Sequence, residues 1–351
     1  MAEKTNSFPM SEAKKIVEDL FEPDPLIYWA DLLLNATLGW AAFAVAVSSA
    51  NFSLIQLLAL VVSVFCLYRA VIFIHELTHL KKDSFEAFRF VWNILCGFPF
   101  MVPSFTYMGV HIDHHKQKMY GTKDDGEYLP FVLVGHGRIV LFFITMTVVP
   151  FVFLLRFLLT PVSYLIPPLR KLLWEYLSSL SIDTDWKRPA PQERDGKYWQ
   201  LQEFVTFLYA AAFMFCLWKG ILPLKVFILW YVVSALILLT NGLRTIAATH
   251  CYRNPASNTL EFSEQFLDSV TVPGNVITTT LWAPVGLRYH AVHHLFPGMP
   301  YHNLGKAHNR LMKELPANSV YRETIRDSLW HGLACIWQET ADTQDRKKVS
   351  R

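Results

Sequence analysis

Histidine is the residue type whose placement in this 351-residue chain suggests chemistry. Eight of its 13 histidines fall in three short groups. The groups are His75 and His79; His111, His114 and His115; and His290, His293 and His294. Positions i, i+3 and i+4 of an α-helix share one face, with Cβ atoms about 5 to 6 Å apart. Each group can therefore direct its imidazoles at one point, and a bound metal would supply the partner that buried polar rings need.

The first group raises the question of which metal. His75, Glu76 and His79 match HExxH, in which two histidines bind zinc and the glutamate is the general base of a protease. A catalytic zinc seldom has more than three protein ligands, so a protease would leave six grouped histidines unused. Imidazole-rich sites with open positions suit iron. We therefore favour two irons, with Glu76 either orienting a histidine ring or remaining a solvated carboxylate.

The composition indicates a membrane protein. Hydrophobic residues make up 52% of the chain and charged residues only 17%. The net charge is +3 and the basic residues are dispersed, which excludes a nucleic-acid partner. The five cysteines include no CxxC pair, so we expect neither a disulfide framework nor a zinc ribbon. The N-terminal segment has no signal-peptide pattern.

Crossing a bilayer takes about 20 largely apolar residues in a helix. The stretches that qualify form two hairpins: 26–49 with 52–74, and 203–219 with 222–241. Two further apolar stretches, about 85–108 and 139–166, contain prolines at 99 and 103 and at 150 and 161, so we expect broken, interfacial or re-entrant helices there. The sequence predicts an all-α integral membrane protein with two transmembrane hairpins, interfacial helices and a helical cap that holds the metals.

Basic residues near membrane helices stay on the cytoplasmic side. The hairpin turns contain only Lys219 and Lys225. The other side has Lys81, Lys82, Lys116, Lys118, Lys123, Arg170, Lys171, Lys187, Arg188, Arg244 and Arg253. We therefore expect a cytoplasmic N-terminal segment (1–25), a membrane domain (26–330) with a cytoplasmic cap (about 75–202 and 242–330), and a tail (331–351).

The depth of the histidines agrees with this topology. His75 and His79 follow directly after the second span. His250 reaches a similar height if the fourth helix continues through "NGLRTIAATH". For all groups to meet, the chain between His115 and His250 must cross the membrane an even number of times, so residues 139–166 should not make a single crossing. Loop-accessibility mapping in membrane vesicles that finds a single crossing in 139–166 would contradict this prediction. We interpret His136, His302, His308 and His331 as ordinary hydrogen-bonded residues.

These motifs resemble a known family. "HELTH", "HIDHH" and "HAVHH" are similar to the three histidine boxes of the membrane fatty acid desaturase and hydroxylase superfamily. "RTIAATHCYRN" resembles its region with an additional histidine ligand, matched by His250, and "LWAPVGLRYHAVHHLFPGMPYHNL" resembles the third box of bacterial-type acyl-chain desaturases. The resemblance covers about residues 26–315. It departs at Ile246, where acyl-CoA desaturases have an asparagine that holds a metal through water, so that ligand is unassigned and Asn241 is a loose candidate.

The resemblance implies two iron ions, O2 as co-substrate, and oxidation of an unactivated methylene in a lipid acyl chain. It implies the ligands His75, His79, His111, His114, His115, His250, His290, His293 and His294. The first box has three residues between its histidines where acyl-CoA desaturases have four, which favours a chain carried on a membrane lipid over acyl-CoA. Desaturation is the leading prediction. The alternatives are a hydroxylase of a lipid, alkane, sterol or carotenoid, the intramembrane zinc protease, and a non-catalytic haem or metal carrier.

Electrons must come from elsewhere, because the chain has no GxGxxG, haem-attachment or CxxC motif. We expect a ferredoxin, or a b-type cytochrome with its reductase. Metal should be lost below about pH 6, because the ligands must be neutral imidazoles, and full iron retention at pH 5 would contradict this. Asp113, Glu264 and Asp268 either orient ligands or are solvated, and Cys251 is interpreted as a packing residue.

Overall fold

The computed structural model of the chain describes residues 8–81 and 85–349. Lys82 and the ends of the expected N-terminal segment and tail lie outside these residues. The chain divides into two compact units, which we describe separately. Unit 1 comprises Met1–Asp24, Asp113–Val140 and Asn241–Arg351, and unit 2 comprises Pro25–Ile112 and Leu141–Thr240. The described residues form helices and a few isolated β-bridges but no β-strands, which confirms the all-α prediction.

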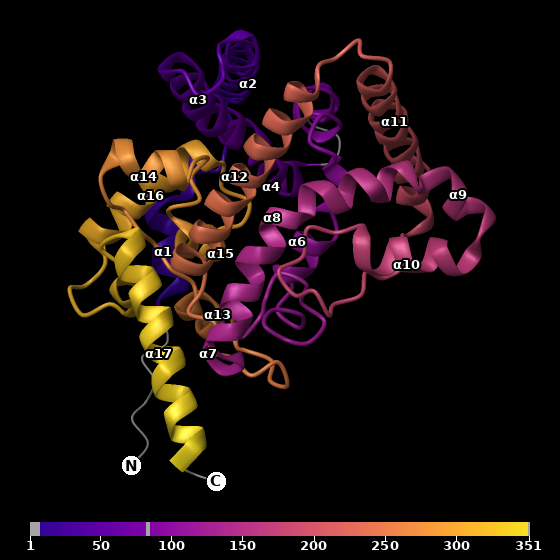
Figure 1. Cartoon of the computed structure of the whole chain (residues 1–351). Helices are drawn as coiled ribbons and strands as arrows, with labels where there is room; N and C mark the ends of the chain where they lie inside the picture. The colour runs from indigo at the N-terminus through magenta and orange to yellow at the C-terminus, as the bar shows by residue number, and fades with distance from the viewer. Residues whose placement is uncertain (1–7, 82–84, 350–351) are drawn as a thin grey trace. The chain divides into compact units, whose positions relative to one another are not determined.

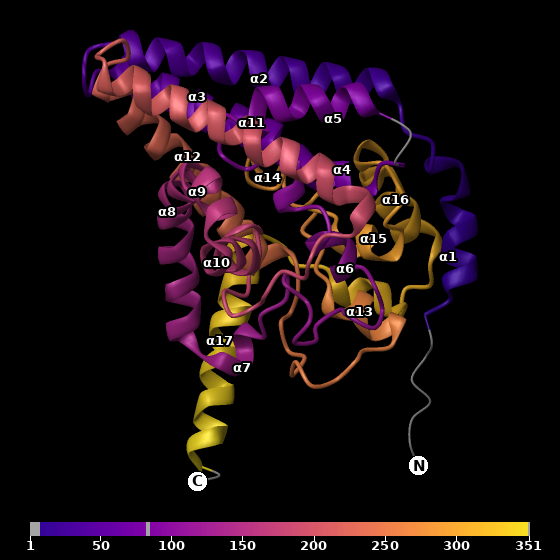
Figure 2. The same ribbon diagram turned by 90° about the vertical axis from the view of Figure 1, so that its right-hand side faces the viewer.

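Unit 2 contains the two predicted hairpins. Its first hairpin is α2 (Pro25–Ser48) with α3 (Leu54–Val71) and α4 (Phe73–His79), and its second is α11 (Glu193–Trp218) with α12 (Leu224–Ala248). Helices α2 and α3 lie side by side (Figures 1 and 2). At Gly39 they are so close that a Cβ would lie 2.5 Å from Leu67 Cγ, so glycine permits this approach. These helices are long and apolar enough to span a membrane, which confirms the integral membrane class.

A fifth helix also qualifies as a span. α8 (His136–Leu158) continues through Pro150, so the predicted break at this proline is wrong. A proline inside a helix removes one backbone hydrogen bond and strains the preceding turn. The Tyr231 hydroxyl of α12 donates to the Thr147 carbonyl in that turn, 2.8 Å away. The other predicted breaks are confirmed at Pro161, which lies in the first turn of α9 (Thr160–Leu165), and in 85–108. The even-crossing argument stays a prediction.

The rest of unit 2 consists of short elements, and a buried ionic cluster joins three of its helices. The short elements are α5 (Glu86–Trp92), η2 (Asn93–Gly97), η3 (Ser104–Thr106), the start of α6 (Val110–His114), α9 and α10 (Pro167–Leu177). Glu203 of α11 pairs with Arg156 of α8 and, at 2.8 Å, with Arg170 of α10. The Glu203 and Arg156 side chains are fully buried. The cluster therefore joins three helices in a region where an unpaired charge would be costly.

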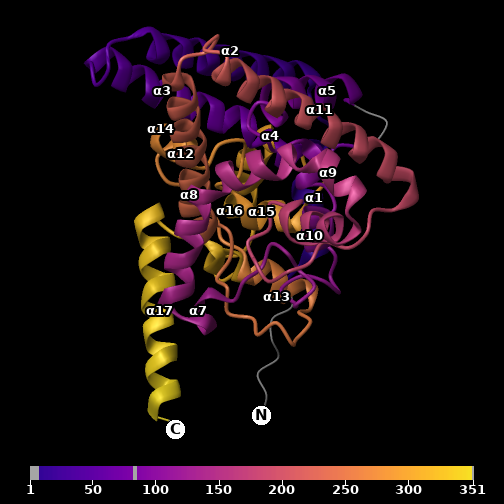
Figure 3. The same ribbon diagram turned by 45° about the vertical axis from the view of Figure 1, so that its right-hand side comes forward.

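Unit 1 is built from shorter helices. They are α1 (Met10–Ile16), η1 (Glu18–Leu20), α7 (Phe131–Val134), α13 (Phe262–Asp268), α14 (Val276–Trp282), α15 (His290–Leu295), α16 (Tyr301–Glu314), η4 (Val320–Thr324) and α17 (Leu329–Val349). The N-terminal segment packs on α16, where the Asn303 amide donates to the Leu20 carbonyl at 2.9 Å. Within this unit, α14 and α16 lie at one end and the C-terminal part of α17 at the other (Figures 1, 2 and 3).

His308 on α16 should make the stability of the protein depend on pH. Burial, together with the nearby Arg288, lowers the pKa of His308 to about 4, whereas an unfolded histidine has a pKa near 6.5. Because the unfolded chain binds the proton more readily, this stabilisation is complete above about pH 6.5 and is lost as the pH falls toward 4. When the pH is lowered from 7 to 5, the unfolding free energy of the parent should fall by about 2 kcal/mol more than that of the His308→Gln variant.

The matched control is His331→Gln, because the His331 side chain is 45% exposed. Unfolding should be followed by circular dichroism in detergent at both pH values. Equal pH dependence in the parent and the His308→Gln variant would contradict the assignment of this proton to His308.

Candidate metal centre

Unit 1 brings together four histidines from three segments. One ring nitrogen from each of His114, His250, His290 and His294 lies within 4.8 Å of the others. All four residues are at least 95% buried. Helix α6 supplies the first, the residues after α12 supply His250, and α15 supplies the last two. Four buried imidazoles with converging nitrogens form a set that could hold one metal ion.

Backbone pairing places His250 beside this cluster. Helix α12 continues to Ala248, which meets the condition set for His250 in the sequence analysis, and the chain then forms an antiparallel bridge between His250 and Ser269. A second bridge joins Thr271 and Tyr289, the residue before α15. The segment that follows α13 therefore connects the His250 region with the third histidine box.

Helix α15 presents the third box on two sides. His290 and His294 are four residues apart and their Nε2 atoms lie 3.0 Å from each other, as helical periodicity predicts. His293 points to another partner, His115, with their Nε2 atoms 2.9 Å apart. His114 and His115 of the second box therefore lie with His250 and the third box within unit 1, whereas His111 belongs to unit 2.

Unit 2 brings the first box together with His111. One ring nitrogen from each of His75, His79 and His111 lies within 4.8 Å of the others. The Nε2 atoms of His79 and His111 are 2.8 Å apart. His75 and His111 are buried, and His79 is half-buried. Helix α6 carries His111 and His114 one turn apart, so a single helix contributes one imidazole to each set.

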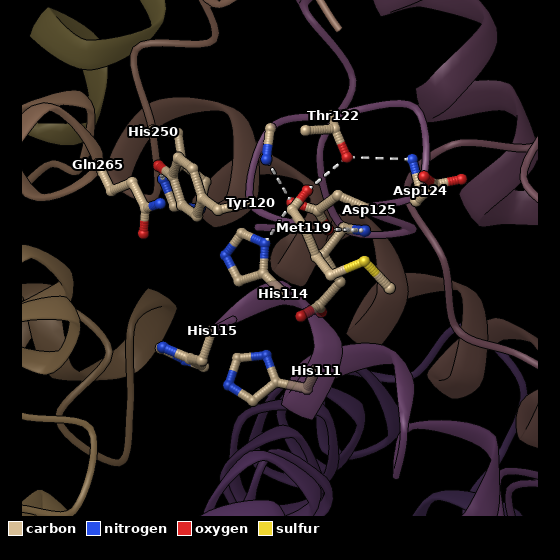
Figure 4. Close-up of polar contacts among 12 residues, drawn as sticks. His111, His114, His115, Met119, Tyr120, Thr122, Asp124, Asp125, His250 and Gln265 are labelled. Atoms are coloured by element: carbon tan, nitrogen blue, oxygen red, sulfur yellow. Dashed lines mark hydrogen bonds and ion pairs between the residues drawn. The ribbon is translucent and has the colours of Figure 1, made fainter. Parts of the chain in front are cut away.

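Asp125 contacts His114 and escaped the sequence analysis. Its Oδ2 atom lies 2.8 Å from His114 Nδ1 and accepts a hydrogen bond from the Gly121 amide at 2.8 Å (Figure 4). Burial lowers the pKa of His114, but the Asp125 carboxylate outweighs this and raises the pKa above its usual value. A hydrogen bond at Nδ1 leaves Nε2 as the nitrogen available to a metal. The contact requires a turn at Gly121, whose φ is +66°, and no residue spacing reveals that turn.

Tyr120 and Asp268 form the corresponding contact at His250. The Tyr120 hydroxyl lies 2.8 Å from His250 Nδ1 and donates to Asp268 Oδ2 at 3.0 Å. Burial raises the pKa of Asp268 to about 6. Burial, and then the neighbouring His114, lower the pKa of His250 well below its usual value. His250 is therefore neutral at physiological pH, which is the form that can bind a metal.

The other candidate carboxylates differ in burial and in their partners. Glu76 is buried, accepts a hydrogen bond from the Tyr28 hydroxyl at 2.6 Å and lies 3.6 Å from His75 Nδ1, so the solvated interpretation is wrong. Asp113 pairs with the exposed Lys116 at 2.5 Å. Glu264 caps the first turn of α13. Asp268 is therefore the one of the three predicted carboxylates that lies next to a ligand candidate through a hydrogen bond.

Several other candidates lie outside the two sets. Ile246 is buried and has no donor atom, and Asn241 Oδ1 accepts from Arg244 within α12. Cys251 packs with Ala248, Val270 and Val272, and burial raises the pKa of its thiol to about 11, in agreement with a packing role. Hydrogen bonds elsewhere engage the four histidines that we interpreted as ordinary, His136, His302, His308 and His331.

Replacing Asp125 with asparagine should weaken metal binding roughly tenfold to a hundredfold, because partners of this kind orient a histidine ligand and increase its basicity. The measurement is metal content after dialysis against graded concentrations of a chelator. Asp113→Asn is the matched control. Asp113 is another aspartate close to His114 in the sequence, but it pairs with the exposed Lys116. Equal retention in the two variants would contradict the role of Asp125.

Comparison with known proteins agrees with this geometry. Residues 51–325 match the fatty acid desaturase family. Over 328 residues the chain is 39% identical to a ceramide hydroxylase of Caulobacter vibrioides (strain NA1000 / CB15N), covering 93% of this chain and 92% of that protein. No solved structure matches the chain. The chain therefore belongs to the fatty acid desaturase family of lipid-acting membrane oxidoreductases.

Proposed function

We propose that this protein is a membrane di-iron hydroxylase that introduces a hydroxyl group into a ceramide or a closely similar lipid, using O2 and electrons from an external donor. The observation that carries this proposal is the similarity to a ceramide hydroxylase along nearly the whole chain. The residues alone favoured desaturation of a lipid acyl chain. The similarity supports hydroxylation ahead of it, and leaves the histidine chemistry unchanged.

The donor atoms of the two histidine sets fit iron. All are imidazole nitrogens, which suit iron with positions left open for O2, and seven of them belong to sets with nitrogens within 4.8 Å. We propose as ligands the nine histidines that the sequence indicated. His115 and His293 complete them, because their Nε2 atoms lie 2.9 Å apart. Helix α6 would then hold both irons, through His111 and His114.

When bound, the irons would supply reductive activation of O2 and removal of hydrogen from an unactivated methylene. The protein's own part is to hold neutral imidazoles in fixed directions. Asp125 keeps the His114 proton at Nδ1, and the Tyr120 hydroxyl fixes the ring of His250. Glu76 Oε1 lies 3.6 Å from His75 Nδ1, which is ion-pair distance and longer than a hydrogen bond. Burial of these groups excludes water from the ligand nitrogens and so protects the oxidising site from side reactions.

Desaturation is the second candidate, since the matching family is named for it. Both reactions begin with loss of one hydrogen from a methylene. They differ in whether oxygen is then transferred to that carbon or a second hydrogen is lost from its neighbour. How the lipid chain is held decides this, because placement determines which atoms come within reach of the oxidant.

Lipid analysis tests the proposal. Membranes from a host that makes the protein, and that is supplied with ceramide, should contain ceramide with one added oxygen atom, labelled when the cells grow under ¹⁸O2. A variant with His290→Ala serves as the matched host control. Ceramide or fatty acyl chains that lack two hydrogens and contain no label would favour desaturation. Unchanged lipids with one bound zinc and no iron would favour the protease, and a Soret band would favour a haem carrier.

We also propose that the histidine sets face the cytoplasm and that a ferredoxin or a b-type cytochrome delivers electrons there. The distribution of basic residues supports this sidedness. Protease protection of inside-out and right-side-out vesicles tests it. Accessible sites in the segment 253–261 on the opposite side only would contradict it.

A further inference from the structure

The segment between Val272 and Arg288 leaves the histidine site and returns to it. The Val272 amide donates to the Arg288 carbonyl at 2.7 Å, and the Arg288 side chain donates to the Pro273 carbonyl at 3.1 Å. These contacts close the two ends of an excursion that contains α14. Its second end continues directly into His290.

The outer side of α14 is apolar and exposed. Val276 is 66% exposed, Ile277 76% and Leu281 45%. At 3.6 residues per turn they lie on one side of the helix, opposite the buried Thr279. Thr280 lies between them, and its hydroxyl donates to the Val276 carbonyl at 2.5 Å. We call the three apolar residues the α14 face. The segment 272–287 contains no charged residue, although a helix exposed to water normally has charges on its outer side.

Two contacts place this face at the end of a candidate membrane span. Trp282, the last residue of α14, packs against the buried cluster of Ala248, Cys251, Val270 and Val272, and Ala248 is the last residue of α12. The start of α17 also lies against this turn, since a Cβ on Gly332 would fall 2.1 Å from the Ala247 carbonyl oxygen. There Trp330 is 72% exposed, and tryptophan is enriched at the membrane–water interface.

The length of α12 indicates where its last turn, with Ala247 and Ala248, lies relative to the bilayer. Its 25 residues extend about 37 Å, compared with about 30 Å for the hydrocarbon layer. The apolar run ends at Thr240, and Asn241 and Arg244 follow. Ala247 and Ala248 would therefore stand at the level of the lipid headgroups. Within unit 1, α14 lies at the end opposite the C-terminal part of α17 (Figure 1).

We propose that the α14 face, with Trp330 beside the same turn of α12, inserts into the surface of the lipid bilayer and seats unit 1 on the membrane. Lipid chains are the occupant that the observations support, because the face is uncharged and largely apolar, and because Trp282 beside it packs on the cluster at the end of α12. The excursion then links the lipid surface to His290 through a short, hydrogen-bonded stretch of backbone.

An environment-sensitive label tests this contact without any requirement for activity. The protein should be placed in phospholipid nanodiscs, with Cys66, Cys216 and Cys335 replaced by alanine, while Cys96 and Cys251 are buried. A nitrobenzoxadiazole label on Ile277→Cys should emit at shorter wavelength and be quenched by spin-labelled lipid. The matched control is the exposed loop position Asn258→Cys, where iodide in the water should quench the label.

A label at position 277 that behaves like the control would overturn the proposal. So would shielding from both quenchers, which would indicate that protein covers the face. A second comparison uses activity: Ile277→Asp should raise KM for bilayer-embedded lipid roughly tenfold with little change in kcat. Phe262→Asp, which alters another exposed apolar side chain of unit 1, should leave KM unchanged. Equal KM values would count against the proposal, whereas absent activity in the parent would contradict only the proposed hydroxylation.

Discussion

Substituting alanine for His250 is expected to lower lipid product formation at least about a hundredfold and to reduce the iron content of the purified protein. The expectation follows from the position of this ring in the set with His114, His290 and His294, where it is fully surrounded by other side chains. Changing a group that only orients a ligand costs tenfold to a hundredfold in metal affinity or activity. Removing the ligand itself should cost more.

Two measurements separate this result from a folding defect. Iron should be counted by elemental analysis, and folding checked by circular dichroism and gel filtration in detergent. His302→Ala is the control, because His302 accepts a hydrogen bond from the Asp24 amide in unit 1 and lies outside both histidine sets. A folded His250→Ala protein with full iron content and activity would remove His250 from the proposed ligands.

The second large effect concerns stability. Glu203→Gln is expected to lower the unfolding free energy by about 3 to 5 kcal/mol, because the substitution leaves Arg156 buried without its countercharge. Arg170, which pairs with the other oxygen of the same carboxylate at 2.8 Å, loses its partner as well. The result should appear as a clear fall in the midpoint of thermal unfolding in detergent.

Asp19→Asn is the comparison, because Asp19 pairs with Arg310 at the exposed surface and should contribute little. A double variant strengthens the test. If charge without a partner is the cause, replacing Arg156 and Glu203 together with methionine should recover much of the stability lost by Glu203→Gln, since apolar replacements of buried pairs are often tolerated. An equal loss in Glu203→Gln and Asp19→Asn would rule out the ionic cluster as a stabilising element.

Patterns within single helices were sufficient to predict several features of this protein. The spacing of His290 and His294 predicted that their rings would meet, because a helix repeats every 3.6 residues whatever surrounds it. The runs of apolar residues likewise predicted the spans of α2, α3, α11 and α12. The continuation of α12 toward His250 was only a condition of the sequence argument, because the apolar run ends at Thr240; the structure shows that the helix extends to Ala248. The first two conclusions each depend on residues within one helix.

The effect of each proline on its helix could not be predicted from the local sequence. Pro161 lies in the first turn of a new helix, as proline commonly does, but Pro150 lies inside α8. Both prolines lie in one long apolar stretch, so the local pattern did not distinguish them. The partners of charged groups were equally hidden. Asp113 was a candidate because it lies between two histidines, yet it pairs with Lys116 at the surface.

The sequence by itself determined which residues could bind metal, which helices carry them and how apolar the spans are, because these properties repeat along one segment of chain. Tertiary structure alone decided that Asp125 faces His114, that Tyr120 connects His250 with Asp268, and that Glu203 balances two arginines. These contacts join residues 11 to 148 positions apart. Their geometry depends on turns and helix packing, which many different sequences can produce, so spacing along the chain carries no signal for them.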